Sequence, residues 1–262
     1  QQMLDALPES PGVYIFYGDT DIPLYIGKSV NIKNRVLSHF SAASLSSTEL
    51  KIASQVKRVE TVTTEGELGA LLRESKLIKQ MQPVYNRRLR GATKLVYLGY
   101  KLNDAGYKEA VTFTSPPQEV LGIFKSLKQA KETLMELSEK HNLCKKLLNL
   151  EKPTSSCFGY QLEKCKGACV GKETPVMHNL RFDMAFVQTK LKSWPFDGAV
   201  MISEGNSKFL VDNWQYCELQ EDNVDLVMEV GTGDVFDLDT YKILSSYIYS
   251  AKKQKNIVVL KK

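Results

Sequence analysis

The sequence predicts an α+β protein that begins with a small domain, in which helices flank a three-stranded antiparallel sheet. Two observations lead to this expectation. Two short β-prone runs joined by a turn come first, and a third β-prone run lies between two helical segments. We expect four parts along the chain: the first domain at 1–95, connecting strands and a helix at 96–140, a four-cysteine segment at 141–174, and a small mixed α/β C-terminal region of unknown role at 175–262.

The first elements are expected to be a hairpin followed by a helix. Val13–Tyr17 and Leu24–Ile26 are short β-prone runs, and the turn-forming residues 18–21 separate them. Asn31 then stands where a helix N-cap is expected, because its side chain can accept a hydrogen bond from an unpaired backbone N–H. We expect this helix to cover Ile32–Phe40.

A third strand and a second helix complete the first domain. They follow the Ser/Ala-rich stretch Ser41–Thr48, which we interpret as a loop or a helix start. Val56–Thr63 alternates and is rich in Val and Thr, which predicts a strand. Residues 65–81 show helical spacing, and Pro83 ends this helix. One face carries Leu68, Leu71, Leu72, Ser75 and Ile78, and the opposite face carries Arg73, Lys76 and Lys79.

The rest of the chain gives weaker signals. Residues 95–124 predict further strands, broken by Pro116 and Pro117, and residues 126–143 predict a helix. The cysteine-rich segment covers residues 144–171. The last ninety residues have a mixed α/β pattern with no recognisable site.

Composition limits the class of protein. Of the 262 residues, 43% are hydrophobic and 25% are charged, as in ordinary soluble proteins. No apolar run approaches the roughly 18 residues that span a membrane, and the first residues do not resemble a signal peptide. Five cysteines in a chain of this length do not suggest a secreted disulfide framework. We therefore expect a cytoplasmic protein without a membrane partner.

The net charge of +5 is distributed unevenly. Residues 1–101 hold 14 Lys and Arg against 9 Asp and Glu, whereas the remaining residues hold 21 of each kind. A local excess of positive charge suits a module that binds phosphates. An ordinary solvated surface is the alternative interpretation, because this excess is modest for a DNA-binding domain.

Candidate site residues lie on the hairpin and on the two helices of the first domain. Tyr14 and Tyr25 lie on paired strands and can share one face, although a strand tyrosine most often only packs. Lys28 follows the second strand. Arg35 and His39 are four residues apart and therefore share one helix face. Glu74 lies on the second helix, and Asn86 follows Pro83.

This pattern resembles the GIY-YIG nuclease family. Gly12-Val13-Tyr14 matches the first signature of the family, and Tyr25-Ile26-Gly27 matches the second. The resemblance implies that Arg35 is the catalytic arginine, that Glu74 binds the metal, and that Asn86 is the asparagine that follows the long helix of the family.

Phosphodiester hydrolysis requires residues of these types. A carboxylate such as Glu74 suits Mg²⁺ (or Mn²⁺), which stabilises a leaving oxygen, and the guanidinium of Arg35 can hold the phosphate. Lys28 can add a positive charge or orient the water. Tyr14 and Tyr25 are both candidate general bases, although the ordinary phenol pKa of about 10 would have to be lowered.

His39 occupies a position where many relatives have Tyr. It could assist proton transfer with a tyrosine. The alternative is a polar residue at a helix end, where the helix dipole favours it.

The resemblance is stronger to the repair branch of the family, the UvrC-type excinucleases, and in particular to their shorter Cho-like members. The stretches 165–173, 194–200 and 241–244 extend it over nearly the whole chain. It implies a 3′ incision in damaged double-stranded DNA after UvrA and UvrB have marked the lesion, by an expected monomer. Some such proteins follow an exonuclease domain. Because the chain does not begin with Met, we expect either a trimmed chain or the C-terminal part of such a fusion.

Four cysteines form a second candidate site. Cys144, Cys157, Cys165 and Cys169 have the spacing C-x12-C-x7-C-x3-C, and four thiolates can close a tetrahedral metal site. The spacing differs from a zinc ribbon, so zinc and an iron–sulfur cluster both remain open. The resemblance to UvrC implies a [4Fe–4S] cluster. Cys217 is isolated, and we interpret it as a small buried hydrophobic residue.

Two other functions remain as alternatives to repair. The chain could be a stand-alone structure-specific or restriction-type nuclease that cuts without partners. It could also be a binding module without activity, although the expected Arg and Glu are both retained.

Overall fold

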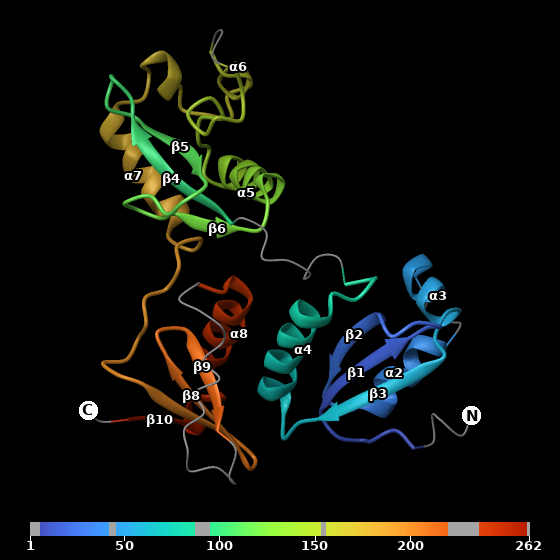
Figure 1. Ribbon diagram of the computed structural model, residues 1–262. Helices are drawn as coiled ribbons and strands as arrows, with labels where there is room; N and C mark the ends of the chain where they lie inside the picture. Colours follow the sequence, from blue (N-terminus) through green and yellow to red (C-terminus); the bar gives the residue numbers. More distant parts are fainter. Residues whose placement is uncertain (1–5, 42–45, 87–94, 153–155, 220–235, 261–262) are drawn as a thin grey trace. The chain divides into compact units, whose positions relative to one another are not determined.

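A computed structural model of the chain describes most of it, and its elements are labelled in Figure 1. The described residues are 6–41, 46–86, 95–152, 156–219 and 236–260. The chain forms two compact units. The first unit combines Gln1–Gly91 with Trp194–Lys262, and the second unit is Ala92–Ser193. This grouping differs from the four consecutive parts expected from the sequence, which remain a prediction.

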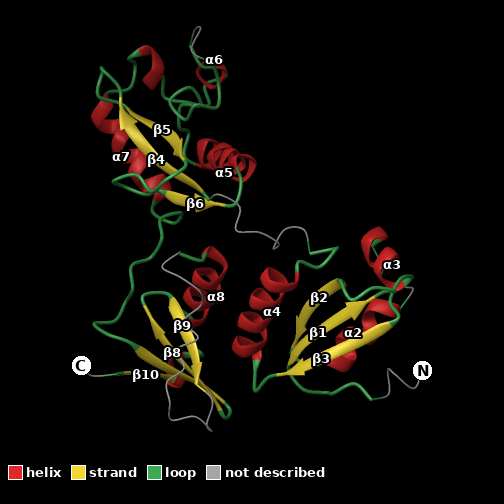
Figure 2. Cartoon of the chain, in the orientation of Figure 1, coloured by secondary structure: helices red, strands yellow, loops and turns green. Residues whose placement is uncertain are grey.

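The first unit contains the expected three-stranded antiparallel sheet, so the predicted fold class is confirmed (Figure 2). β1 (Gly12–Tyr17) lies in the middle, between β2 (Pro23–Ser29) and β3 (Arg58–Thr63). The register of β1 and β2 sets Tyr14 opposite Gly27, two residues beyond Tyr25. Both signature segments therefore meet in one hairpin.

Local capping explains where the first helices begin. α2 (Ile32–Phe40) starts as expected, because the Asn31 side chain accepts a hydrogen bond from the Asn34 N–H over 2.9 Å. α3 (Ser47–Ala53) begins with a capping box formed by Ser46 and Glu49. The expected loop or helix start at 41–48 lies partly outside the described residues, at 42–45.

α4 (Glu67–Met81) is the long helix of the first unit. It ends at Gln82, which takes a left-handed conformation with φ 50° directly before Pro83. The helix lies between the three-stranded sheet and α8 (Leu238–Ile248), and it contacts both (Figure 1). Ile78 packs on the sheet together with Val13, Ile15 and Ile26.

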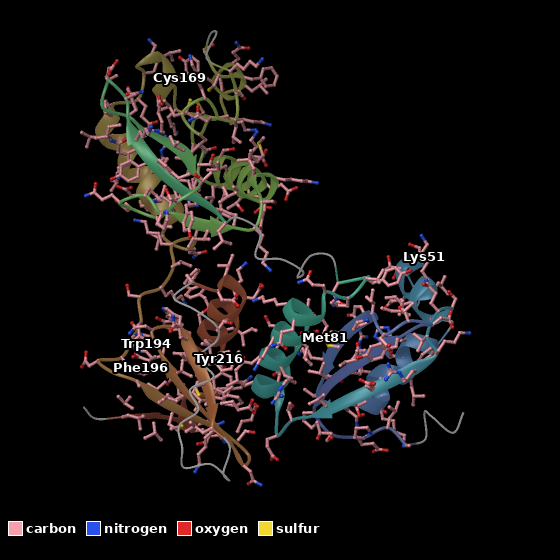
Figure 3. All side chains as sticks on the ribbon, in the orientation of Figure 1. Lys51, Met81, Cys169, Trp194, Phe196 and Tyr216 are labelled. Carbon is pink, nitrogen blue, oxygen red and sulfur yellow. The ribbon has the colours of Figure 1, made fainter. Side chains whose placement is uncertain are left out.

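The C-terminal part of the first unit forms a second antiparallel sheet with the strand order β10-β7-β8-β9. Its core includes Leu68 and Leu72 of α4, so this helix contributes to two hydrophobic clusters. Trp194, Phe196 and Tyr216, labelled in Figure 3, pack against this core. The elements are β7 (Val200–Glu204), β8 (Ser207–Asp212), β9 (Gln215–Leu219), α8, the 3-10 helix η3 (Gln254–Asn256) and β10 (Ile257–Val259).

Glu204 caps the N-terminus of α4 from a distant part of the sequence. The helix starts after Gly66, which has no side chain to cap it. Instead, the Glu204 carboxylate accepts hydrogen bonds from the N–H groups of Leu68 and Gly69, over 2.9 and 2.8 Å. A negative charge at this end also interacts favourably with the helix dipole. A side chain at Gly66 would collide with Glu204, since a Cβ there would lie 2.3 Å from its Cδ.

The basic face of α4 is paired with acidic residues of the C-terminal part. Arg73 donates to Glu218 over 2.9 Å, and Lys79 binds Asp237. These contacts join the same two segments as the shared hydrophobic core. The expected basic face is therefore partly used within the fold.

The second unit has its own three-stranded antiparallel sheet, in the order β5-β4-β6, and its own core. The strands expected within 95–124 and the helix expected within 126–143 are both confirmed. Among the described residues, no helix is long and apolar enough to span a bilayer. The elements are β4 (Val96–Leu102), β5 (Lys108–Phe113), β6 (Gly122–Phe124), α5 (Leu127–Lys140), α6 (Phe158–Gln161), the 3-10 helix η2 (Ala168–Val170) and α7 (Pro175–Phe186).

Candidate active site

Three aromatic rings meet between the three-stranded sheet and α2. The Tyr14 hydroxyl lies 2.8 Å from His39 Nε2, and the ring centroids of Tyr14 and Tyr25 are 6.1 Å apart. Tyr14 and His39 are buried, whereas Tyr25 is half-buried. The structure therefore brings both candidate tyrosines and His39 together, and Tyr25 is the more accessible of the two tyrosines.

Gly27 leaves the space that this arrangement needs. A Cβ atom on Gly27 would lie 2.3 Å from the Tyr14 hydroxyl and 2.8 Å from Tyr25 Cε1. Both contacts are shorter than van der Waals distance, so any side chain would push the two rings away. The glycine of the second signature is thus required by the packing of the tyrosines.

The protonation of these groups follows from their burial. Burial raises the pKa of Tyr14, and a negative charge on the neighbouring Tyr25 would raise it further. Burial also raises the pKa of Tyr25, and so does Glu74, while Arg35 and a hydrogen bond with Tyr14 lower it. Burial and the charge of Arg35 lower the pKa of His39, so its ring is favoured in the neutral form.

Arg35 is an exposed cation beside the tyrosines. It lies on α2, one turn before His39, and its charge acts on both tyrosines. Its guanidinium donates to Ser38 Oγ over 3.5 Å, and a hydrogen bond with Arg35 lowers the pKa of Tyr14. The rest of the guanidinium is available for an anion.

Glu74 faces the end of β2. Its Oε1 accepts a hydrogen bond from the backbone N–H of Lys28 over 3.1 Å. Burial raises the pKa of this carboxyl, while the hydrogen bond and the charge of Lys28 lower it. Among the described residues, no cationic side chain forms an ion pair with Glu74. A desolvated carboxylate of this kind suits a divalent cation, which would favour the ionised form.

The Lys28 ammonium is held by a residue that sequence analysis did not single out. Its Nζ lies 3.0 Å from Glu67 Oε1, and Lys253 Nζ lies 3.3 Å from Glu67 Oε2. Glu67 therefore bridges the candidate site and the C-terminal part of the unit. No local signal could have identified it, because Lys253 is 186 residues away in sequence.

The Asn86 side chain forms hydrogen bonds with the backbone of β2 and does not point between the two tyrosine rings. Its Oδ1 accepts from the Ile26 N–H over 2.9 Å, and its Nδ2 donates to the Ile26 carbonyl over 2.8 Å. The N–H groups of Val84 and Tyr85 donate to the carbonyls of Pro23 and Leu24. The segment thus runs along the free edge of β2 and holds the strand that carries Tyr25.

The four expected cysteines converge in the second unit. The sulfur atoms of Cys144, Cys157 and Cys169 lie within 4.8 Å of one another, and Cys165 Sγ lies 3.2 Å from Cys157 Sγ. All four are free thiols rather than disulfides. Cys217 likewise forms no disulfide, and it is buried on β9 of the first unit, as expected for a small hydrophobic residue.

The surroundings favour a thiolate at Cys144 but not at Cys165 and Cys169, since a hydrogen bond with Cys144 and burial raise the pKa of Cys165, and burial raises the pKa of Cys169. A hydrogen bond from Cys165 and others from Cys169 and Cys157 lower the pKa of Cys144, against the effect of burial. Backbone N–H groups of Cys157 and Gly167 point at sulfur atoms, each over 3.4 Å. Four soft ligands within reach of one centre fit a structural metal or a cluster.

Comparisons with known protein families divide the chain into two matched regions. Residues 10–87 match the family described as "UvrC-like GIY-YIG domain". Residues 97–188 match the family described as "UvrC/Cho excinuclease, middle domain". The first match contains all the candidate residues of the first unit, and the second contains the four cysteines.

Full-length relatives are similar over almost the whole chain. "Excinuclease cho" of Escherichia coli (strain K12) is 36% identical over 260 residues, which cover 95% of this chain and 86% of the relative. "Excinuclease cho" of Salmonella typhimurium is also 36% identical, over 259 residues, which cover 95% of this chain and 86% of that relative. "UvrABC system protein C" of Wolbachia sp. subsp. Brugia malayi is 31% identical over 66% of this chain, but this covers only 29% of that protein.

Solved structures are similar to the first region. One of them is the GIY-YIG N-terminal endonuclease domain of UvrC from Thermotoga maritima, bound to magnesium as its catalytic divalent cation. The match has 33% identity and covers 32% of this chain and 92% of that chain, with a TM-score of 0.30.

Proposed function

Since the chain belongs to the UvrC/Cho family of GIY-YIG excinucleases, we propose that it is a metal-dependent DNA endonuclease that makes the 3′ incision in nucleotide excision repair. The observation that carries this proposal is that the charges of Arg35 and Glu74 both act on the half-buried Tyr25, in a chain similar to Cho proteins over 95% of its length.

Tyr25 is the tyrosine that accepts the proton of the attacking water. It is half-buried and can be reached by solvent, whereas the Tyr14 hydroxyl is buried and bonded to His39. Burial and the charge of Glu74 raise the pKa of Tyr25, and the charge of Arg35 and a hydrogen bond with Tyr14 oppose this rise. Charge on a bound divalent cation would add to that opposition. In this assignment Tyr14 and His39 are positioning residues. Tyr14 forms a hydrogen bond with Tyr25, and His39 holds the Tyr14 hydroxyl in place.

Arg35 binds the scissile phosphate. Its guanidinium is exposed and lies on the same side as the tyrosines. A planar fork of N–H donors can bind two phosphate oxygens, and it stabilises the charge that builds up on them during the attack.

Glu74 holds the divalent cation, for which Mg²⁺ is the proposed ion and Mn²⁺ an alternative. When bound, the ion stabilises the negative charge on the leaving oxygen. A single protein carboxylate fits Mg²⁺, which usually keeps several waters and takes further oxygens from phosphates. Lys28 fixes this carboxylate through its backbone N–H, and its ammonium adds a positive charge near the phosphate site.

The four cysteines hold a structural or redox-sensing group, and we favour a [4Fe–4S] cluster over zinc. The thiols converge from the loop after α5, from the N-terminus of α6 and from η2. A group bound there would fasten three segments that contain little regular structure.

The proposed substrate is damaged double-stranded DNA presented by UvrB after recognition by UvrA. Two further expectations are an exonuclease domain that precedes this segment in the full-length protein, and a monomeric state. A stand-alone GIY-YIG nuclease that cuts branched or unmodified DNA is the second candidate function, since the proposed roles of the described site residues concern the phosphate and the metal and not the lesion.

Incision of a 5′-labelled duplex with one bulky adduct, in the presence of UvrA, UvrB and ATP, tests the proposal. We expect one cut 3′ to the adduct that requires Mg²⁺ and UvrB. Arg35→Ala and Glu74→Ala should each reduce this incision by at least about 100-fold. Arg73→Ala is the matched control: it lies next to Glu74 but pairs with Glu218, so it should retain activity.

Two outcomes would change the assignment. Cutting that is independent of the adduct and of UvrB would favour the stand-alone nuclease. Normal incision by Arg35→Ala or Glu74→Ala would show that the proposed site is wrong, provided that the variants have the circular dichroism spectrum of the unmodified protein.

A further inference from the structure

α7 carries an exposed apolar seam in the second unit. Met177, Leu180, Met184 and Val187 are 57, 57, 62 and 66% exposed. Their spacing of three, four and three residues is the a/d spacing of a helix that packs against another helix. The opposite face of α7 is already used, because Phe182, Ala185 and Phe186 pack in the core of the unit. The seam is therefore separate from the face of α7 that packs in the core of the unit.

A groove follows this seam and continues onto the cysteine segment. It has a volume of about 560 Å³, and Met177, Leu180 and Met184 contribute its apolar side. Lys166 and Lys172 contribute its basic side, and both are exposed. Among the described residues, no ion pair involves either ammonium. Methionine and leucine side chains can adapt to the shape of a partner, as on other helix-binding surfaces.

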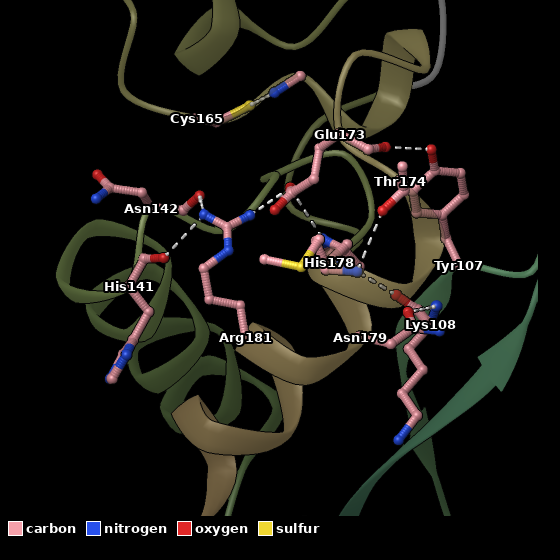
Figure 4. A network of polar contacts seen from close by, with 12 residues as sticks. Tyr107, Lys108, His141, Asn142, Cys165, Glu173, Thr174, His178, Asn179 and Arg181 are labelled. Atoms are coloured by element: carbon pink, nitrogen blue, oxygen red, sulfur yellow. Dashed lines mark hydrogen bonds and ion pairs between the residues drawn. The ribbon is translucent and has the colours of Figure 1, made fainter.

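A network of polar contacts holds the two sides of the groove together (Figure 4). Arg181 on α7 binds the Glu173 carboxylate and also donates to the carbonyl of Asn142 over 2.9 Å. The Tyr107 hydroxyl donates to the Glu173 carbonyl over 2.5 Å. These contacts fasten α7 to the end of the cysteine segment, so the groove is formed before anything binds to it.

We propose that this groove is a docking site for an acidic amphipathic helix of a partner protein. Apolar side chains of the partner pack between Met177, Leu180 and Met184, and its carboxylates bind Lys166 and Lys172. The proposal does not depend on the nuclease reaction, because none of these residues belongs to the proposed active site.

The chemistry of the groove favours a protein helix over other occupants. DNA would place charged phosphates against the exposed methionines and leucine, which offer no hydrogen bonds. A second copy of the chain would bring the same two lysines to the contact, where an acidic partner is more favourable.

Binding of labelled synthetic helical peptides to the full chain tests the proposal. One peptide carries leucines at positions a and d and glutamates beside them, and the second carries lysines in place of the glutamates. Fluorescence anisotropy should show tighter binding of the glutamate peptide. Leu180→Glu and Met184→Glu should each weaken this binding by at least about tenfold. Leu127→Glu is the matched control, since Leu127 is exposed on α5 outside the groove.

A charge exchange separates the basic side from the apolar seam. The double variant Lys166→Glu, Lys172→Glu should lose the glutamate peptide and gain the lysine peptide. The proposal is wrong if the glutamate peptide does not bind, if both peptides bind equally, or if Leu180→Glu leaves binding unchanged. It is also wrong if Leu180→Glu instead abolishes binding to duplex DNA. The same holds if Leu180→Glu abolishes a dimer that light scattering detects in the unmodified protein.

Discussion

Asn86 pairs with both backbone groups of Ile26, through its Oδ1 at 2.9 Å and its Nδ2 at 2.8 Å. One side chain thereby replaces a neighbouring strand at the free edge of β2. The residues on either side of Ile26 are Tyr25 and Gly27, so the clamp holds the part of the strand that carries the second signature.

Asn86→Ala should therefore destabilise the first unit and also reduce incision. Two hydrogen bonds to a buried strand are lost, which should lower the free energy of unfolding by about 1–3 kcal/mol. Urea unfolding followed by circular dichroism measures this change. Asn86→Asp is the comparison, because it keeps the acceptor for the Ile26 N–H but loses the donor. An alanine variant with unchanged stability would contradict the clamp.

Glu204 should stabilise α4 although it is 136 residues away from Leu68. Glu204→Ala leaves two N–H groups at the helix start without their acceptor, and we expect a loss of about 1–2 kcal/mol in unfolding free energy. Glu218→Ala removes only the partly exposed pair with Arg73 and should cost less than about 1 kcal/mol. Equal effects of the two substitutions would argue against the capping role.

His39 should make the stability of the first unit depend on pH. Its pKa is lowered in the folded protein, so the folded state binds fewer protons than the unfolded state. The stabilisation is full above the ordinary pKa of about 6.5 and is lost as the pH falls toward the folded value. Unfolding free energies at about pH 7.5 and about pH 5.5 should therefore differ more in the unmodified protein than in His39→Gln.

The His39→Gln variant is essential in this measurement, because Glu74 makes the unfolding free energy change with pH in the opposite direction. Its raised pKa contributes stability at low pH that is lost as the pH rises. Only the difference between the unmodified protein and His39→Gln isolates the histidine. Identical pH dependence of the two proteins would exclude a contribution of His39.

The cysteine site should bind metal only when all four thiols are present. Protein purified without oxygen should contain iron, or zinc in the alternative case, by elemental analysis, and Cys165→Ser should lose most of it. Cys217→Ser should keep the full content, since Cys217 lies on β9 of the first unit, whereas the other four cysteines belong to the second unit. Equal metal content in both variants would mean that the metal is bound elsewhere.

Much of the first unit could be predicted because its signals are local. Asn31 caps α2 through the residue three positions later, and Pro83 follows the end of α4 directly. The candidate residues were identified by short signature motifs, and the structure brings Tyr14, Tyr25 and His39 together. The contacts of Asn86, by contrast, could not be deduced from its position after a helix.

The role of the C-terminal residues could not be predicted, for a physical reason. Glu204, Glu218 and Lys253 interact with α4 across more than 130 residues of chain. Their charges look like those of an ordinary surface until the fold is known. Leu68 and Leu72 likewise show only that one helix face is apolar, and not that a second sheet covers it.

The first unit is discontinuous in sequence, and α4 is where its two pieces meet. A single protease cut near residue 194 would therefore not release a complete folded body. The two fragments would stay associated through the core around Leu72 and the pair of Arg73 with Glu218, as in a split protein. A gene truncated after residue 91 would instead leave that side of α4 uncovered, so its product should aggregate unless the missing piece is supplied in trans.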